Sequence, residues 1–74
     1  MPRLPVVSAD GFLRAVGKLG YRVDRQRGSH TILECAGRKP LVVPRHGELK
    51  PGLLRGLIRD AGLTVEEFTA LLRD

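Results

Sequence analysis

The residues best suited to chemistry lie in one short stretch, Arg25-Gln26-Arg27-Gly28-Ser29-His30. The stretch combines an imidazole, which can accept or donate a proton near neutral pH, with two guanidinium groups and a hydroxyl. Imidazole beside guanidinium favours acid–base chemistry on an anionic substrate. An isolated histidine is more often an ordinary surface residue, so the elements that position His30 must decide between these interpretations.

Two strands joined by a turn are predicted around this stretch. Residues 21–26 alternate crudely, residues 27–29 have turn composition, and residues 30–35 are rich in β-formers. Residues 41–43 form a third, short strand between two prolines, which suits an edge strand because proline cannot donate to a ladder. The short turns between these strands predict an antiparallel meander.

Alternation along the second strand divides its side chains between the two faces of the sheet. Thr31, Leu33 and Cys35 share one face, and we assign Leu33 and Cys35 to the core. His30 then lies on the opposite, open face at the end of the strand, where a substrate can reach it. The same geometry excludes a dyad of Ser29 and His30, because neighbouring side chains in a strand point apart.

Three helices are predicted to accompany the strands, from apolar spacing and from capping residues. The first runs between Ser8 and Gly20, the second begins at Pro51 and ends at Gly62, and the third begins at a capping box of Thr64 and Glu67. The order α-β-β-β-α-α, with helices on one side of a three-stranded antiparallel sheet, predicts an α+β fold. The length of 74 residues predicts a single domain over residues 1–74.

Charge is distributed unevenly along the chain. Residues 14–59 carry eleven Lys or Arg against three acidic residues, a net +8, whereas residues 60–74 carry a net −3. A basic body indicates an anionic partner, with nucleic acid as the first candidate, although a solubilising surface explains the charge equally well. Only three aromatic residues are present, which argues against a reader that stacks single-stranded bases.

Composition also indicates the cellular compartment of the protein. No apolar run approaches the roughly 20 residues that cross a bilayer, so we expect no membrane association. The first residues are too short and too rich in proline for a signal peptide. Cys35 is the only cysteine and cannot form an intrachain disulfide, which suits a reducing compartment. We therefore expect a cytoplasmic protein.

Other chemical candidates are weaker. His30 and His46 have no third ligand at a recognisable spacing, so we predict no metal site and no cofactor. His46 belongs to a loop near the active face or closes a turn. Cys35 is expected to be a buried apolar residue rather than a nucleophile. Lys50 precedes the predicted helix start at Pro51, where a cation and free N–H groups can contact phosphate.

The ordered set of motifs resembles a known family. Residues 20–30, from Gly20-Tyr21 to Gly28-Ser29-His30, are similar to the segment of the HicA-type (YcfA-like) mRNA interferase toxins that ends in Arg-Gln-x-Gly-Ser-His. Val43-Pro44-Arg45-His46 is similar to that family's Val-Pro-x-His element, and residues 48–68 resemble its C-terminal helices. The resemblance covers about residues 8–72.

This resemblance implies a double-stranded-RNA-binding-like fold and RNA cleavage, with His30 at the position of the catalytic histidine. It also implies a cognate HicB-type antitoxin that covers the active face. We assign the binding of RNA, as mRNA, to Arg25, Arg27, Gly28, Ser29 and Lys50, with the arginines as phosphate ligands and Gly28 allowing close approach of the RNA backbone.

The predicted function is therefore that of the toxin of a type II toxin–antitoxin system. It is expected to be a metal-independent endoribonuclease that binds and cleaves RNA with a single catalytic histidine and so inhibits translation and growth. The attacking 2′-OH belongs to the RNA, so the protein needs to align it, move protons and offset charge. One histidine cannot act as base and acid at once, and water, His46 or an arginine-polarised leaving group must supply the other role. The alternatives are a non-catalytic RNA-binding module of the same fold and, with less support, a DNA-binding repressor.

Overall fold

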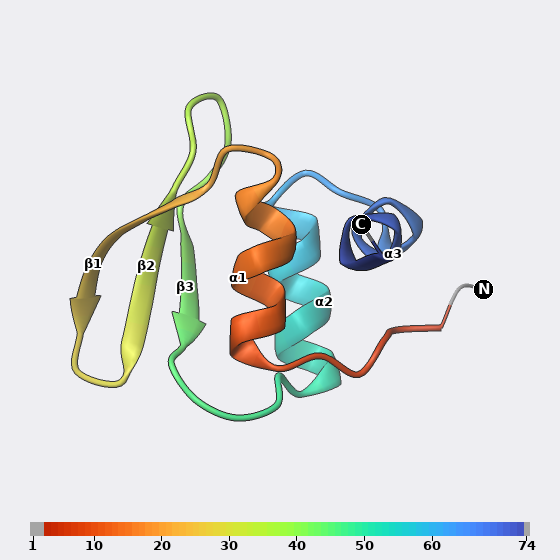
Figure 1. The fold of residues 1–74 in the computed structure, drawn as a ribbon, viewed down its shortest axis with the longest axis horizontal. Coiled ribbons are helices and arrows are strands. Elements are labelled where there is room, and N and C mark those ends of the chain that lie inside the picture. Colours follow the sequence, from red (N-terminus) through yellow and green to blue (C-terminus); the bar gives the residue numbers. More distant parts are fainter. Residues whose placement is uncertain (1–2, 74) are drawn as a thin grey trace.

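The computed structural model describes residues 3–73, which form three helices and three strands in the predicted order (Figure 1). The elements are α1 Ala9–Gly17, β1 Arg22–Arg27, β2 His30–Glu34, β3 Leu41–Pro44, α2 Pro51–Asp60 and α3 Val65–Arg73. The strands form one antiparallel sheet in the order β1-β2-β3, and the helices lie together beside β3. The predicted α+β fold is confirmed.

The helix starts follow the capping chemistry in the sequence. The Oγ of Ser8 accepts a hydrogen bond from the Gly11 N–H at 3.0 Å, and Pro51 opens α2 at its first position. The capping box of α3 is complete, because Thr64 and Glu67 exchange two hydrogen bonds of 2.8 and 3.0 Å. These caps satisfy N–H groups that the helices leave without internal partners.

Two helices end at the glycines that the sequence predicts as stops. Gly62 follows α2 with a φ of +81°, as expected for a glycine stop. Helix α1 also stops at its predicted glycine. Its last helical residue is Gly17, and in the turn that follows, the Gly20 N–H donates to the Gly17 carbonyl and the Tyr21 N–H donates to the Val16 carbonyl, the two bonds of a Schellman motif. Gly20 closes that turn with a φ of +108°, a conformation that L side chains rarely adopt.

The core lies between the sheet and the helices. Its largest fully buried side chains come from every element except β1; they are Phe12, Phe68, Leu33, Leu41, Leu54, Val16 and Val43. The rings of Phe12 on α1 and Phe68 on α3 have centroids 5.3 Å apart, so α3 is packed directly against α1. Burial of these side chains supplies most of the driving force that fixes the sheet against the helices.

Two residues near the strand ends lie elsewhere than predicted. Tyr21 precedes β1 instead of beginning it; its ring is buried and its hydroxyl donates to the Lys39 carbonyl at 2.8 Å. Cys35 lies one residue beyond β2 and is partly buried against the core, so full burial of this thiol was wrong. Both residues lie just outside their strands, where strand alternation no longer predicts which side chains are buried.

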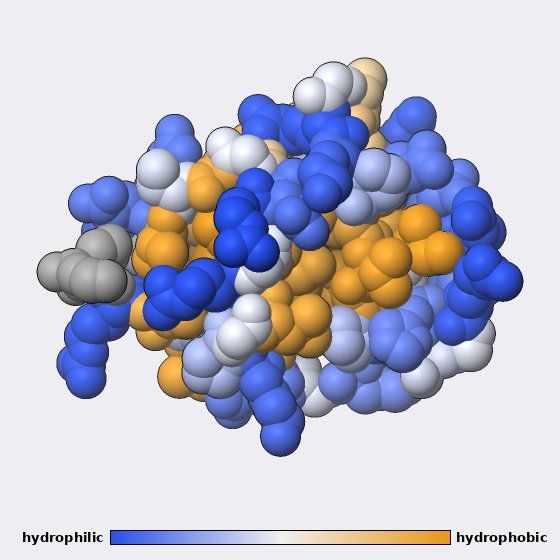
Figure 2. Space-filling model, turned by 180° about the vertical axis from the view of Figure 1, so that it is seen from behind, coloured by the Kyte–Doolittle hydropathy of each residue, from blue (hydrophilic) through white to orange (hydrophobic). Residues whose placement is uncertain are grey.

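Strand β1 extends beyond the helices. All six of its residues are exposed, although Val23 pairs with the buried Leu33 of β2. Its register shifts between Val23 and Arg25, so Asp24 forms an irregularity that explains the crude alternation in the sequence. Seen from behind, apolar side chains gather over the middle of the molecule and hydrophilic ones surround them (Figure 2).

Among residues 3–73, none of the helices has both the length and the apolar character needed to cross a membrane.

Candidate active site

A two-residue turn places His30. Gly28 has a φ of +58° and no other residue than glycine has a positive φ among those described, so Ser29 follows it with a negative φ. That combination fits a type II′ turn, whose twist matches a β-hairpin. Arg27 and His30 therefore close the hairpin as direct partners across β1 and β2. The predicted turn of residues 27–29 was one residue too long, because Arg27 belongs to β1.

His30 lies on the open face of the sheet, as the alternation predicted. It is exposed, whereas Thr31 and Leu33 are 3% and 1% exposed on the opposite face. Residues paired across antiparallel strands share a face, so Arg27, His30 and Pro44 form one row across the sheet. Arg25, Ile32 and Val42 form the next row on the same face.

Both predicted arginine ligands thus flank the histidine. In such a ladder the Cβ atoms of direct partners lie about 5 Å apart and diagonal ones about 7–8 Å apart. Arg27 is the direct partner of His30 and Arg25 is a diagonal one. Arg25 bonds Asp24 through an exposed ion pair of 2.5 Å, whereas the part of the chain that the structure describes offers Arg27 no ionic or hydrogen-bonding side-chain partner. Of the two predicted phosphate ligands, Arg27 is therefore the one whose side chain has no partner among the described residues.

Lys50 stands apart from this hairpin, at the start of α2. It is exposed and occupies the N-cap, where its side chain makes no capping hydrogen bond. The first turn of α2 contains no acidic residue. A cation at the positive end of a helix dipole is unfavourable for the helix itself, and an anion bound there would relieve it. Figure 1 shows the start of α2 and the β1–β2 turn at the same end of the molecule.

The sequence prediction missed Arg45 and Gln26. The Arg45 guanidinium donates to Oε1 of Gln26 on β1 at 2.5 Å, and the Arg45 N–H donates to the Ser29 carbonyl at 2.7 Å. Together these bonds tie the end of β3 to the turn that carries His30. Carrying the alternation one residue past β3 would have placed both side chains on the same side of the sheet.

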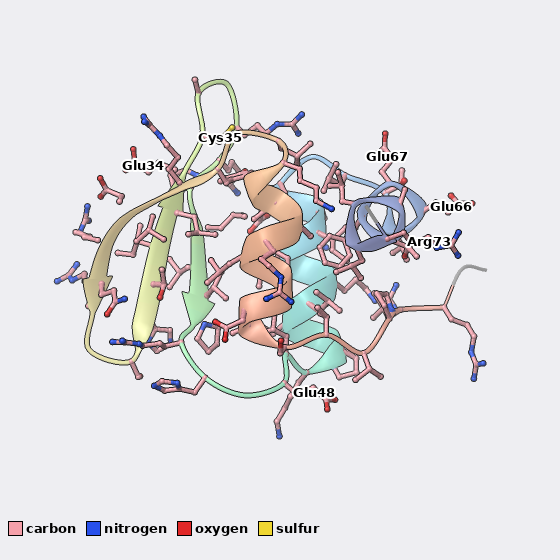
Figure 3. The ribbon with its side chains drawn as sticks, in the orientation of Figure 1. Glu34, Cys35, Glu48, Glu66, Glu67 and Arg73 are labelled. Carbon is pink, nitrogen blue, oxygen red and sulfur yellow. The ribbon has the colours of Figure 1, made fainter. Side chains whose placement is uncertain are left out.

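Apart from Asp24, which pairs with Arg25 on β1, the acidic side chains are mostly remote from this site. Glu66 and Glu67 lie on α3, on the far side of the helices from the strands, and Glu34 lies toward the other end of β2 (Figure 3). Glu48 alone among the labelled carboxylates lies at the lower end, in the loop before α2. The open face around His30 and Arg27 therefore keeps the positive charge that the sequence gives this part of the chain.

Among the described residues, His30 belongs to no cluster of metal ligands and does not line the hollow at the other end of the sheet. Residues 3–73 contain no group of three or more His, Cys, Asp or Glu side chains that could hold a metal ion. A hollow of about 470 Å³ lies at the opposite end of the sheet, lined in part by Gly37, Arg38 and Ala61. His30 instead occupies an open strand face, a shape suited to a polymer backbone rather than to an enclosed small molecule.

Comparison with known families identifies the chain. Residues 9–63 match the model of the family described as "HicA toxin of bacterial toxin-antitoxin". The chain belongs to the HicA toxin family. The matched residues include the whole hairpin, His30, β3, the loop with His46 and all of α2, and they end before the α3 helix. No curated protein matches this HicA family member.

Proposed function

We propose that this HicA family member is a metal-independent endoribonuclease that cleaves mRNA with His30 as an acid–base group and thereby inhibits translation and growth. The observation that carries the proposal is the row of Arg27 and His30 on the open face, where the described residues give neither side chain a partner. Such a pair combines a proton-transfer group with a fixed positive charge for the phosphorane transition state.

The remaining contacts follow from the elements around this row. Arg25 and Arg27 hold phosphates beside the scissile bond, and Gly28 and Ser29 let the RNA backbone approach the turn closely. Lys50 contacts a more distant phosphate at the start of α2. The whole chain, residues 1–74, acts as one HicA-like domain in the cytoplasm and needs no cofactor, because RNA supplies the 2′-OH nucleophile.

The antitoxin of the pair is proposed to cover this same open face. Val42 is 51% exposed there, next to the partly buried Ile32, and Arg25 is the other neighbour of Ile32 in the same row. An apolar centre with a charged rim is the usual composition of a protein interface. A HicB-type antitoxin with acidic residues around an apolar contact would block His30 and neutralise Arg25 and Arg27 together.

The test compares the wild type, His30→Ala and the control variant Arg73→Ala after induced expression, with growth and RNA integrity followed. The expected result is that His30→Ala loses about 10²–10⁴-fold in RNA cleavage and no longer arrests growth, because the proton-transfer group is gone. Arg73 is an exposed residue of α3, remote from His30, so its variant should resemble the wild type. A folded His30→Ala variant that cleaves RNA and arrests growth like the wild type would refute the proposal.

A binding measurement separates the enzyme from a non-catalytic RNA-binding module. His30→Ala should retain RNA affinity, and that affinity should fall steeply with salt, because phosphate contacts release counterions. If the purified wild type binds RNA in this way and cleaves none, the binding module is the better description.

A further inference from the structure

A second proton-transfer group is required by the reaction proposed above. When the 2′-oxygen attacks phosphorus, its proton must leave, and the 5′-oxygen that departs must receive a proton. A single imidazole cannot perform both transfers in the same step. The chain contains one other histidine, His46, in the loop between β3 and α2.

The backbone brings His46 to the same end of the sheet as His30. The Ser29 carbonyl, which precedes His30, accepts the N–H of Arg45, which precedes His46, at 2.7 Å. Standard bond lengths then limit the distance between the two histidine Cα atoms to roughly 10 Å. Two side chains mounted this closely can reach the two sides of one phosphodiester.

The loop around His46 is anchored on both sides. Arg45 is fixed to the hairpin by its backbone bond to Ser29 and its side-chain bond to Gln26. Gly47, on the other side, accepts a hydrogen bond of 2.9 Å from the N–H of Ala9 at the start of α1. Groups held between such supports keep the geometry that proton transfer demands.

Strand alternation also favours this arrangement. Pro44 shares the face of His30 as its direct partner on β3, and Arg45 turns to the other side, where it reaches Gln26. His46 follows two residues after Pro44, in the bend of residues 45–47 just beyond the row of His30 and Pro44. His46 is exposed, and its ring has no hydrogen-bonding partner among residues 3–73.

We infer that His46 is the second catalytic residue and performs the proton transfer complementary to that of His30. One imidazole takes the 2′-OH proton as the bond from O2′ to phosphorus forms. The other gives its proton to O5′ as the bond from phosphorus to O5′ breaks and its electron pair stays on oxygen. The products are a 2′,3′-cyclic phosphate and a 5′-hydroxyl, and proton exchange with water restores both rings.

The inference rests on the proposed ribonuclease function, and a modified RNA tests the two separately. One oligonucleotide is all RNA, and its twin carries a 5′-bridging sulfur at the bond that the wild type cleaves. A thiolate leaves without being protonated, so the twin does not need the general acid. The proteins are the wild type, His30→Ala, His46→Ala and His46→Gln, with Glu66→Gln on α3 as the control.

On the all-RNA oligonucleotide, both His46 variants should lose about 10²–10⁴-fold, while the control keeps full activity. On the sulfur twin, either the His46 variants or the His30 variant, but not both, should recover to near the wild-type rate, and that result identifies the acid. His46 variants within about threefold of the wild type on RNA would overturn the inference while leaving His30 as the catalyst. So would equal losses by both histidine variants on both substrates.

Gly47 provides a variant that moves His46 without removing it. Gly47 has a φ of +84°, which alanine adopts only with strain, so Gly47→Ala should displace the neighbouring imidazole. Cleavage of RNA should fall at least tenfold, and a wild-type rate for a folded Gly47→Ala protein would count against a positioned His46. A wild-type protein that cleaves neither oligonucleotide would remove the proposed function and this inference together.

Discussion

The two ends of the sheet meet the helices in different ways. At one end, which we call the closed end, the β2–β3 loop of residues 35–40 is bonded to the end of α2: Arg38 donates to the Ala61 carbonyl at 2.6 Å and Lys39 lies 3.6 Å from Asp60. At the other, the site end, the β1–β2 turn and the β3–α2 loop leave Arg27, His30, His46 and Lys50 without side-chain partners among the described residues.

The difference shows how the same residue types are used for stability or for binding. At the closed end, Arg38 donates to a carbonyl at the C-terminus of α2, where positive charge is favourable, and Lys39 pairs with the Asp60 carboxylate. At the site end, Lys50 lies where α2 begins, a position that is unfavourable for a cation unless an anion is bound, and Arg27 lies on the β1–β2 hairpin without a side-chain partner among the described residues. Substitutions at the closed end should therefore change stability, and substitutions at the site end should change activity on RNA.

A matched pair of glycines tests this contrast with the largest expected effect. Gly28 at the site end and Gly37 at the closed end both have positive φ, of +58° and +79°, and a Cβ would meet no atom at either position. Alanine at each should therefore lower the free energy of unfolding by about 1–2 kcal/mol through backbone strain alone. Only Gly28→Ala should also lower RNA cleavage, at least tenfold, because the turn sets the pairing of Arg27 with His30.

Urea unfolding and RNA cleavage, both at a temperature where each variant is folded, measure the two effects. A loss of cleavage in Gly37→Ala equal to that in Gly28→Ala would remove the contrast between the ends.

A pair of arginines gives the next largest effect. Arg38→Ala should lower the free energy of unfolding by about 1–2 kcal/mol, because it removes the bond to the Ala61 carbonyl at a helix end. Arg27→Ala should change the free energy of unfolding by less than about 0.5 kcal/mol, since this side chain is exposed and has no partner among the described residues. Arg27→Ala should instead reduce the dependence of RNA affinity on the logarithm of salt concentration by roughly 0.7 for each phosphate that the protein no longer neutralises.

Thermal unfolding and RNA titrations at several salt concentrations distinguish these outcomes. If Arg27→Ala leaves the salt dependence unchanged while Arg38→Ala reduces it, RNA binds the closed end instead.

The free energy of unfolding should also depend on pH at the closed end, because Tyr21 titrates there. Burial of its ring raises the pKa of Tyr21 above the ordinary 10.0, the negative charge of Cys35 raises it further, and Arg38 acts in the opposite direction. The unfolded chain therefore releases the phenol proton first, so stability is complete below about pH 10 and is lost as pH rises through the folded-state pKa. Tyr21→Phe should lose about 1 kcal/mol at neutral pH with the bond to Lys39, and should lack this alkaline decline.

Unfolding by urea at pH 7 and at stepped pH values above 9 provides the measurement. A decline of the same size in Tyr21→Phe would assign the alkaline loss of stability to another group.

Most of the fold could be predicted because local patterns and tertiary structure agree. The capping box of Thr64 and Glu67, the proline at Pro51 and the alternation through Thr31 and Leu33 each depend on nearest neighbours along the chain, and each prediction was confirmed. The bounds of β1 were misplaced by one residue because burial of the Tyr21 ring and its bond to Lys39 involve distant residues.

The hairpin part of the candidate site could be predicted for the same reason, and the part contributed by the β3–α2 loop could not. Strand alternation and the Gly28–Ser29 turn placed His30 on the open face beside Arg27. The bonds of Arg45 to Gln26 and Ser29 join segments some 16–19 residues apart, and nothing in the local sequence of either segment specifies that pairing. The loop near the active face was expected for His46, but the bonds that fix this loop to the hairpin could be found only from the three-dimensional structure.

The smallest expected effect concerns one carboxylate at the edge of the site. Asp24 pairs with Arg25 on β1, and both side chains are well exposed, 37% and 55% respectively. Asp24→Asn should change the free energy of unfolding by less than about 0.5 kcal/mol, because exposed ion pairs contribute little. It should free Arg25 for phosphate and raise RNA affinity by roughly twofold to fivefold at low salt. The control is Glu66→Gln on α3, which changes the net charge by the same amount far from the hairpin. Equal gains in affinity for the two variants would show that net charge alone attracts the RNA, whereas a gain confined to Asp24→Asn would show that the RNA backbone passes along β1 beside His30.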